Sequence, residues 1–207
     1  MIRAGQDNPV VGRDMRLASP TITVFDLEFT AWECSMARHW LSPGEFKEVV
    51  QIGAVKLDAD SFTPVAEFDC LVRPRVNFPL QPYFEKLTGI TSEQVARQGR
   101  DFTAALARFL EFAEGGPIAS FGRDDAVLEE NVRLYGMPAP ALPVFYDLRG
   151  WFAVQGLDPR GLHSCDIGPA VGVPFEGHSH NALDDARSIA GAMAKMAGGR
   201  GAFRPAA

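Results

Sequence analysis

The sequence contains few cysteines, no long apolar run and no surplus of positive charge, and each absence excludes a class of protein. Cys34, Cys70 and Cys165 are far apart and match no zinc-binding spacing, and an odd number fits a disulfide framework poorly. No apolar stretch approaches the roughly 20 residues of a membrane span. The first 20 residues lack the apolar core of a signal peptide. We therefore expect a soluble, intracellular protein, cytoplasmic in location, with reduced cysteines.

The net charge of −6 argues against binding long nucleic acids through a broad basic surface. It is compatible with a small site in which metal ions, rather than basic side chains, meet phosphate. Carboxylates that bind divalent cations make a protein look more acidic than its working site is.

A chain of 207 residues is long enough for one sizeable α/β domain. We expect that domain at residues 21–197, between a flexible leader at 1–20 and a flexible tail at 198–207. Early strands follow one another directly and later strands are separated by helices, which predicts a mixed five-stranded sheet flanked by helices. The expected strands are 21–29, 49–57, 65–72, 117–121 and 144–146, and the expected helices are 102–112, 124–135, 147–154, 162–171 and 182–196, with a further helix start at 91–93.

Asp26 and Glu28 lie in the mostly apolar segment Thr21–Phe29. Residues two apart in a strand point to the same face, so the two carboxylates are side by side. Charged groups are costly in such a strand unless they are paired or bind a metal, and a divalent cation would remove their mutual repulsion. The alternative is a strand end whose acids are simply solvated.

Asp124 and Asp125 follow the expected strand at 117–121 and begin a helix. Acids are favoured at helix N-termini by the free N–H groups and the helix dipole, so capping alone could explain the pair. Asp125 lies on one stripe with Leu128 and Val132, at spacings of three and seven residues. This stripe faces the sheet, which makes Asp125 the better candidate to point into the domain.

The third acidic place precedes the last helix. Asp185 lies in the first turns of that helix, and His180 lies in the loop just before it. A histidine with a near-neutral pKa beside an acid is suited to take a proton from water. The alternative is a capped helix with histidines on its surface.

Taken together, these motifs resemble those of the DEDDh exonucleases, the DnaQ-like group with a ribonuclease-H-like fold. The resemblance spans roughly residues 22–196, and the motifs follow one another in the order found in the family. It is nearest to the branch that trims RNA 3′ ends, the histone-mRNA exonuclease type. The segments that carry it are Asp26-x-Glu28 with Thr30, Ser120–Asp125, His180-x4-Asp185, Leu87–Thr91 and Gln51–Val55.

The family spacing also separates neighbouring candidates. Asp184 as the metal ligand would need histidine five residues earlier, where a serine stands, so the pattern selects His180 with Asp185. The acid of the second motif lies three residues after a glycine or alanine, which selects Asp125. His178 receives no role and is interpreted as a bystander or a phosphate contact.

The resemblance implies a 3′→5′ exonuclease that releases nucleoside 5′-monophosphates with the help of two Mg²⁺ or Mn²⁺ ions. In that scheme Asp26 bridges both ions, Glu28 and Asp185 help to hold one of them, and Asp125 supports the other. His180 accepts the proton of the attacking water. Hard oxygen ligands suit these ions better than zinc.

By position, Phe29, Thr30, Tyr83 and Leu87 match family residues that contact the terminal nucleotide, although ordinary helix packing would also explain the last two. The connection at 30–47 is longer than in shorter relatives and could be a flap or a partner surface. Single-stranded RNA ends are the expected substrate. A DNA exonuclease is the alternative, and a non-catalytic nucleic-acid-binding module a third. Many relatives are homodimers, so a homodimer is a further expectation.

Overall fold

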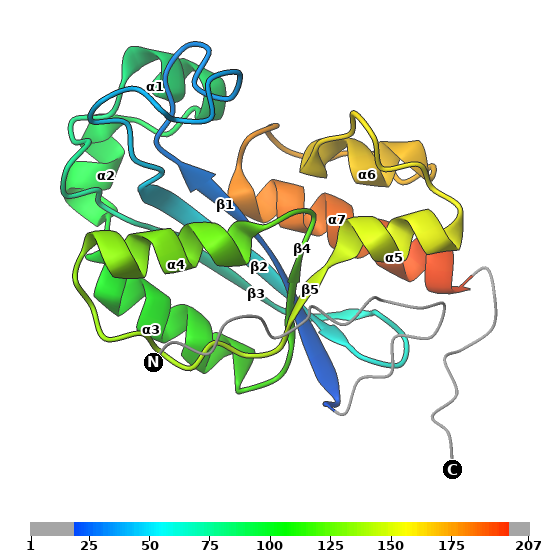
Figure 1. Cartoon of the computed structure of the whole chain (residues 1–207). Helices are drawn as coiled ribbons and strands as arrows, with labels where there is room; N and C mark the ends of the chain where they lie inside the picture. The colour runs from blue at the N-terminus through cyan, green and yellow to red at the C-terminus, as the bar shows by residue number, and fades with distance from the viewer. Residues whose placement is uncertain (1–18, 199–207) are drawn as a thin grey trace.

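The computed structural model describes residues 19–198 and contains a five-stranded sheet flanked by helices (Figure 1). The expected leader and tail therefore lie almost wholly outside the described residues. Across the sheet the strands follow the order β3-β2-β1-β4-β5. They are β1 (Thr21–Phe29), β2 (Val49–Asp58), β3 (Pro64–Leu71), β4 (Ile118–Ser120) and β5 (Phe145–Asp147).

The pairing directions are those that the sequence predicts. β1 pairs antiparallel with β2 across a long connection that contains no helix, and β2 pairs antiparallel with β3 across a short turn. β1 pairs parallel with β4, and β4 with β5, because each of these connections contains helices. The mixed sheet expected from the order of elements is thus confirmed.

Helices cover both faces of the sheet (Figure 1). α3 and α4 pack on one face, and α5, α6 and α7 pack on the other. Among the described residues, no helix is long and apolar enough to cross a membrane. The helices are α1 (Pro82–Thr88), α2 (Ser92–Gln98), α3 (Phe102–Ala113), α4 (Asp124–Leu134), α5 (Leu148–Gln155), α6 (Ser164–Ala170) and α7 (Ala182–Gly198).

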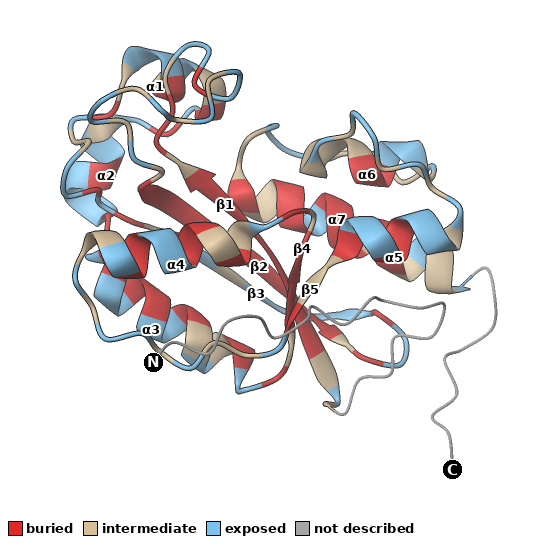
Figure 2. Cartoon of the chain, viewed as in Figure 1, coloured by how far each residue is buried: buried red, intermediate tan, exposed pale blue. Residues whose placement is uncertain are grey.

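β1 lies in the centre of the sheet and is buried on both faces (Figure 2). Ile22 and Val24 pack in the core on the α7 side, whereas Phe25 and Leu27 pack in the core on the α3 side. This double coverage explains why the strand reads as a nearly continuous apolar run. An acid within it is therefore forced into a buried position.

The connection between β1 and β2 is fixed to the domain. The Thr30 hydroxyl donates to the Phe46 carbonyl at 2.5 Å and accepts from the Glu48 backbone N–H at 3.0 Å. The Trp40 indole N–H donates to the Thr30 carbonyl, and its ring packs on Phe29 with centroids 5.5 Å apart. The long connection is thus anchored at both ends and through its second tryptophan.

Candidate active site

Asp26 and Glu28 lie near the carboxyl end of β1, on the face that α7 covers. They are only 8% and 7% exposed, so their charges lack the stabilisation that water would give. Burial raises the pKa of Asp26 to about 7. Burial, followed by repulsion from Asp26 and Asp185, also raises the pKa of Glu28 well above its ordinary value.

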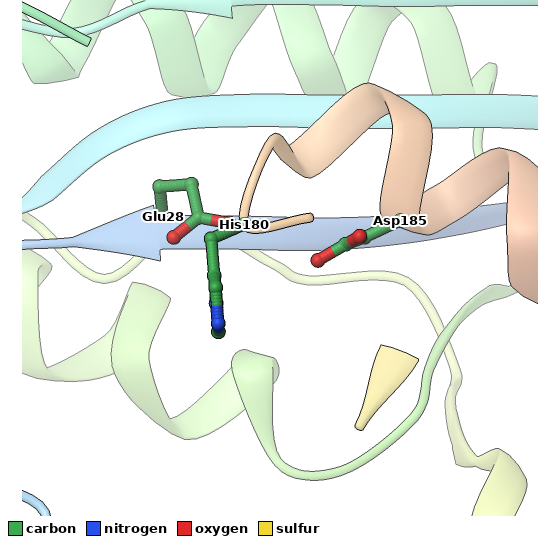
Figure 3. Close-up of side chains that lie close together, drawn as sticks. All are labelled: Glu28, His180 and Asp185. Carbon is green, nitrogen blue, oxygen red and sulfur yellow. The ribbon is translucent and has the colours of Figure 1, made fainter. Parts of the chain in front are cut away.

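His180 and Asp185 approach Glu28 from the start of α7 (Figure 3). One ligand atom from each of these three side chains lies within 4.8 Å of the other two. Glu28 is more than 150 residues away from the other two along the chain, and the contact of α7 with β1 and β2 brings them together. The expected meeting of the first and third motifs is thus present in the structure.

Asp185 is the clearest sign that a positive charge belongs here. Its Oδ1 is the only buried side-chain nitrogen or oxygen of the described residues without a hydrogen-bond partner. Burial and the nearby Asp26 raise the pKa of Asp185 to about 8, although the backbone N–H of His180 opposes the rise. An unpartnered buried carboxylate oxygen is costly, and a cation beside it would remove that cost.

His180 adopts a left-handed backbone conformation with φ of 62°, which is uncommon for residues other than glycine. This conformation turns the chain sharply before α7. Burial lowers the pKa of His180, and the neighbouring His163 and His178 lower it further. The imidazole is therefore neutral at physiological pH and has a free ring nitrogen to accept a proton.

The two acids at the start of α4 divide their roles. Asp125 is buried, as its stripe predicts, but it accepts two hydrogen bonds from Arg123, at 2.8 and 2.9 Å. Asp124 is half-buried, and burial followed by repulsion from Asp26 raises its pKa well above the ordinary value. Asp124 also contributes to the raised pKa of Glu28. Electrostatically, Asp124 rather than Asp125 belongs to the carboxylate group around Asp26.

Asp184 and His178 hold the loop in front of α7. The Asp184 carboxylate accepts from the His178 backbone N–H at 2.9 Å and from Arg187 at 2.8 Å. Gly177 makes this possible, since a Cβ there would lie 2.2 Å from the Asp184 carboxylate. Asp184 therefore stabilises the loop. This role is compatible with the sequence analysis, in which the family spacing selects Asp185 rather than Asp184 as a site residue.

The proposed contacts to a terminal nucleotide differ in exposure. Tyr83 is 41% exposed on α1, and Leu87 of the same helix is half-buried. Phe29 is half-buried against Trp40. Thr30 is buried, and its hydroxyl is already engaged by the connection between β1 and β2. Tyr83 and Leu87 are therefore accessible for stacking on a nucleotide, whereas the Thr30 hydroxyl is occupied by hydrogen bonds within the protein.

Sequence reasoning did not single out Ser164, at the start of α6. Its hydroxyl donates to Asp26 Oδ1 at 2.7 Å and lowers the pKa of that carboxyl against the larger effect of burial. Ser164 also lines a cavity of about 360 Å³ with Phe121, Arg149 and His163. A lone serine at a short helix start gives no motif, so no sequence signal could have found it.

The donor set fits a hard divalent cation. Several carboxylates and one imidazole converge, and the raised pKa values of the acids show that their negative charges are insufficiently compensated within the protein. Oxygen-rich groups of this kind suit Mg²⁺ or Mn²⁺. The orphaned Asp185 oxygen indicates where a ligand atom is free.

Residues 23–193 match the family model described as Exonuclease (RNase_T). The chain belongs to this exonuclease family. The match confirms the resemblance found in the three sequence motifs and makes this protein a nuclease. No curated protein matches the sequence significantly.

Solved structures confirm the ribonuclease-H-like fold. The nuclease domain of 3′hExo, a DEDDh family member bound to rAMP, superposes with a TM-score of 0.74 at 22% identity, covering 90% of this chain and 95% of that one. The cell-death related nuclease 4 (CRN-4) gives 0.70 at 20% identity, with 89% and 65% covered. Exonuclease I of E. coli in complex with dA16 gives 0.64 at 19% identity, with 88% of this chain but only 41% of that protein covered.

Proposed function

We propose that this protein is a metal-dependent 3′→5′ exonuclease that removes nucleoside 5′-monophosphates from the 3′ ends of short or single-stranded RNA. The observation that carries the proposal is the convergence of Glu28, His180 and Asp185 around an unpartnered buried oxygen. Asp26 completes the set from the same strand as Glu28. The family match supplies the reaction class.

Four acids would hold the cations: Asp26, Glu28, Asp185 and one aspartate of α4. The family spacing favours Asp125 for the last place, and the electrostatic coupling to Asp26 favours Asp124. Because both carboxylate oxygens of Asp125 already accept hydrogen bonds from Arg123, we assign this place to Asp124. When bound, divalent cations supply positive charge that stabilises the reacting phosphate and lowers the pKa of water.

His180 is the proposed general base. Its neutral imidazole takes a proton from a water molecule as the water oxygen forms a bond to phosphorus, and the bond from phosphorus to the 3′ oxygen of the preceding nucleotide breaks. The departing 3′ oxygen takes up a proton from solvent, so the products are a nucleoside 5′-monophosphate and a shortened chain that ends in a free 3′ hydroxyl. Partial burial of His180 keeps its pKa low, so it is ready to accept the proton near neutral pH.

Tyr83 and Leu87 of α1, with Phe29 after the two acids of β1, are the proposed contacts of the terminal nucleotide. Stacking on apolar and aromatic surfaces tolerates any base, as an enzyme that removes successive nucleotides requires. Thr30 would contribute by positioning Phe29, because its own hydroxyl is engaged.

The preference for RNA is supported by the similarity to 3′hExo bound to rAMP and to a 3′-exonuclease that recognises the histone mRNA stem-loop. The similarity to exonuclease I bound to dA16 or dT13 favours single-stranded DNA as the second candidate. Both reactions would use the same carboxylates. Action in the cytoplasm and as a homodimer stay predictions.

The test is degradation of 5′-labelled RNA and DNA oligomers of matched sequence with Mn²⁺, with Mg²⁺ and with a chelator. We expect a ladder that shortens from the 3′ end, faster on RNA, and no shortening with the chelator. Asp26→Ala should abolish the ladder, and Asp60→Asn, in an exposed turn, is the matched control. Equal degradation by wild-type protein and the Asp26 variant would disprove the proposal, and faster degradation of DNA would select the second candidate.

A further inference from the structure

Two residues of β2 that lie beside the acids of β1, Gln51 and Gly53, form the surface on which the start of α7 rests. In the antiparallel register Gln51 is opposite Glu28, and Gly53 is opposite Asp26. Opposite residues of such a pair point to the same face, so both β2 positions face α7. Neither position carries an acid, and neither would be selected by a search for metal ligands.

Gly53 allows the backbone of α7 to lie directly on the sheet. A Cβ at this position would be 2.1 Å from the Leu183 backbone nitrogen and 2.2 Å from the Ala182 carbonyl carbon. Both are backbone atoms, which cannot rotate away as the end of a side chain could. Since Gly53 does not have positive φ, it is this close approach and not backbone conformation that requires glycine.

Gln51 adds a specific bond to the same contact. Its side-chain carbonyl oxygen accepts from the Ala182 backbone N–H at 2.9 Å, and its amide nitrogen donates to Asp69 on β3 at 2.9 Å. Gln51 is 2% exposed, so the second bond fixes which end of the amide faces α7. The Ala182 N–H is one of the helix N-terminal donors that lack a partner within the helix.

We infer that Gln51 and Gly53 are positioning residues that set the distance between the acids of β1 and the pair His180 and Asp185. Ala182 is three residues before Asp185 and two after His180, so its seat on β2 fixes both. The inference rests on the proposed function for its activity measurements. The prediction for metal binding is independent of the proposed function, because metal binding depends on the same distances and can be measured without substrate.

The experiment compares three variants of the full chain. Gln51→Leu keeps the approximate volume but leaves the Ala182 N–H without an acceptor, and Gly53→Ala forces the helix start away from the sheet. Ile52→Ala is the control, because Ile52 lies between them, is fully buried and packs on the opposite face with α3 and α4. Each is measured for melting temperature, for Mn²⁺ affinity by calorimetry, and for kcat and KM on the RNA oligomer.

We expect Gln51→Leu to weaken Mn²⁺ binding by on the order of 10-fold, the usual effect of removing a group that orients a metal ligand. Its kcat should fall while KM stays unchanged, because the terminal nucleotide is bound elsewhere. Gly53→Ala should weaken Mn²⁺ binding and lower kcat more strongly. If this variant does not fold, the Gln51→Leu variant alone tests the inference. Ile52→Ala should melt at lower temperature but bind Mn²⁺ as the wild type does.

A Gln51→Leu variant that melts at lower temperature, yet binds Mn²⁺ and turns over like the wild type, would overturn the inference. So would an equal loss of Mn²⁺ affinity in Ile52→Ala, since this would reduce the effect to general destabilisation. A wild type that binds Mn²⁺ but degrades no oligomer would instead refute the proposed function, and the binding measurements would still test the positioning.

Discussion

α4 and α7 each carry two consecutive aspartates in their first turn, and the members of each pair have different roles. In α7 the first, Asp184, holds a loop and an arginine, while the second, Asp185, is buried with one oxygen unpartnered. In α4 the second, Asp125, is paired with an arginine, and the first, Asp124, is coupled to Asp26. Each helix thus contributes one acid to the site and one to local structure.

The order differs because the helices begin at different points relative to their aspartates. α4 starts at Asp124 itself, whereas α7 starts two residues before Asp184, at Ala182. Each residue rotates the side-chain direction by about 100° on a helix of 3.6 residues per turn. Which aspartate faces the carboxylates of β1 therefore depends on how each helix start is seated on the sheet.

The largest expected effect is at Asp185. Asp185→Asn should reduce kcat/KM by about 10³-fold or more, because the loss of a ligand to a catalytic cation removes several kcal/mol of transition-state stabilisation. Asp184→Asn should leave most activity, because only one of its two structural bonds can no longer form. The measurement is turnover of the labelled oligomer at saturating Mn²⁺. Equal losses in the two variants would contradict the division of roles in α7.

The next effect distinguishes the acids of α4. Asp124→Asn should lower activity by on the order of 10²-fold, which corresponds to about 3 kcal/mol, less than for a ligand at the centre of the site. Asp125→Asn should cost less, because its charge is already neutralised by Arg123. Activity is measured across a Mn²⁺ titration, in which the Asp124 variant should also require more metal. The reverse order would restore Asp125, the residue that family spacing selects.

Most of the fold could be predicted from the sequence, whereas the choice within the α4 pair could not. Apolar runs and helical periodicity reflect burial, so they located β1 and α7 correctly. The stripe with Leu128 and Val132 correctly predicted that Asp125 is buried, but burial on that stripe leads to the α3 side of the sheet and to Arg123. Local periodicity predicts which residue points into the domain, but it does not predict which group that residue contacts there.

The roles of Ser164 and Gln51 lay beyond sequence reasoning for a related reason. Each depends on a hydrogen bond to a partner more than 100 residues away, and only the assembled fold defines these partners. α1 was not delimited either, although α6, which has the same length, was expected.

A third prediction concerns the stability of the protein without metal. The pKa values of Asp26 and Asp185 are raised from 3.8 to about 7 and about 8, respectively. At a pH between the ordinary and the raised values, these two groups bind more protons in the folded protein than in the unfolded chain. The contribution of these two groups to stability must then fall as the pH rises from about 4 to 8. The melting temperature, measured with chelator present, should fall across this range, and added Mn²⁺ should restore it.

The same linkage predicts that the two Asp→Asn substitutions within each aspartate pair change the melting temperature in opposite directions. At pH 8 without metal, Asp185→Asn and Asp124→Asn should raise the melting temperature, by roughly 2–4 °C for each kcal/mol of relieved repulsion. Asp184→Asn and Asp125→Asn should lower it, because they break structural bonds. A melting temperature independent of pH, or stabilisation by all four variants, would contradict this assignment.

The smallest effect should come from the arginine that supports the structural acid of α7. Arg187 donates to both Asp184 and Glu67, but it is about half-exposed, and exposed ion pairs stabilise by only about 0–1 kcal/mol. Arg187→Gln should therefore lower the melting temperature by no more than a few degrees and leave activity unchanged. Arg160→Gln, which breaks a more exposed pair with Asp158, is the control. A large loss of activity in the Arg187 variant alone would mean that Asp184 needs its arginine to hold the histidine loop, and the separation of structural from catalytic aspartates in α7 would then fail.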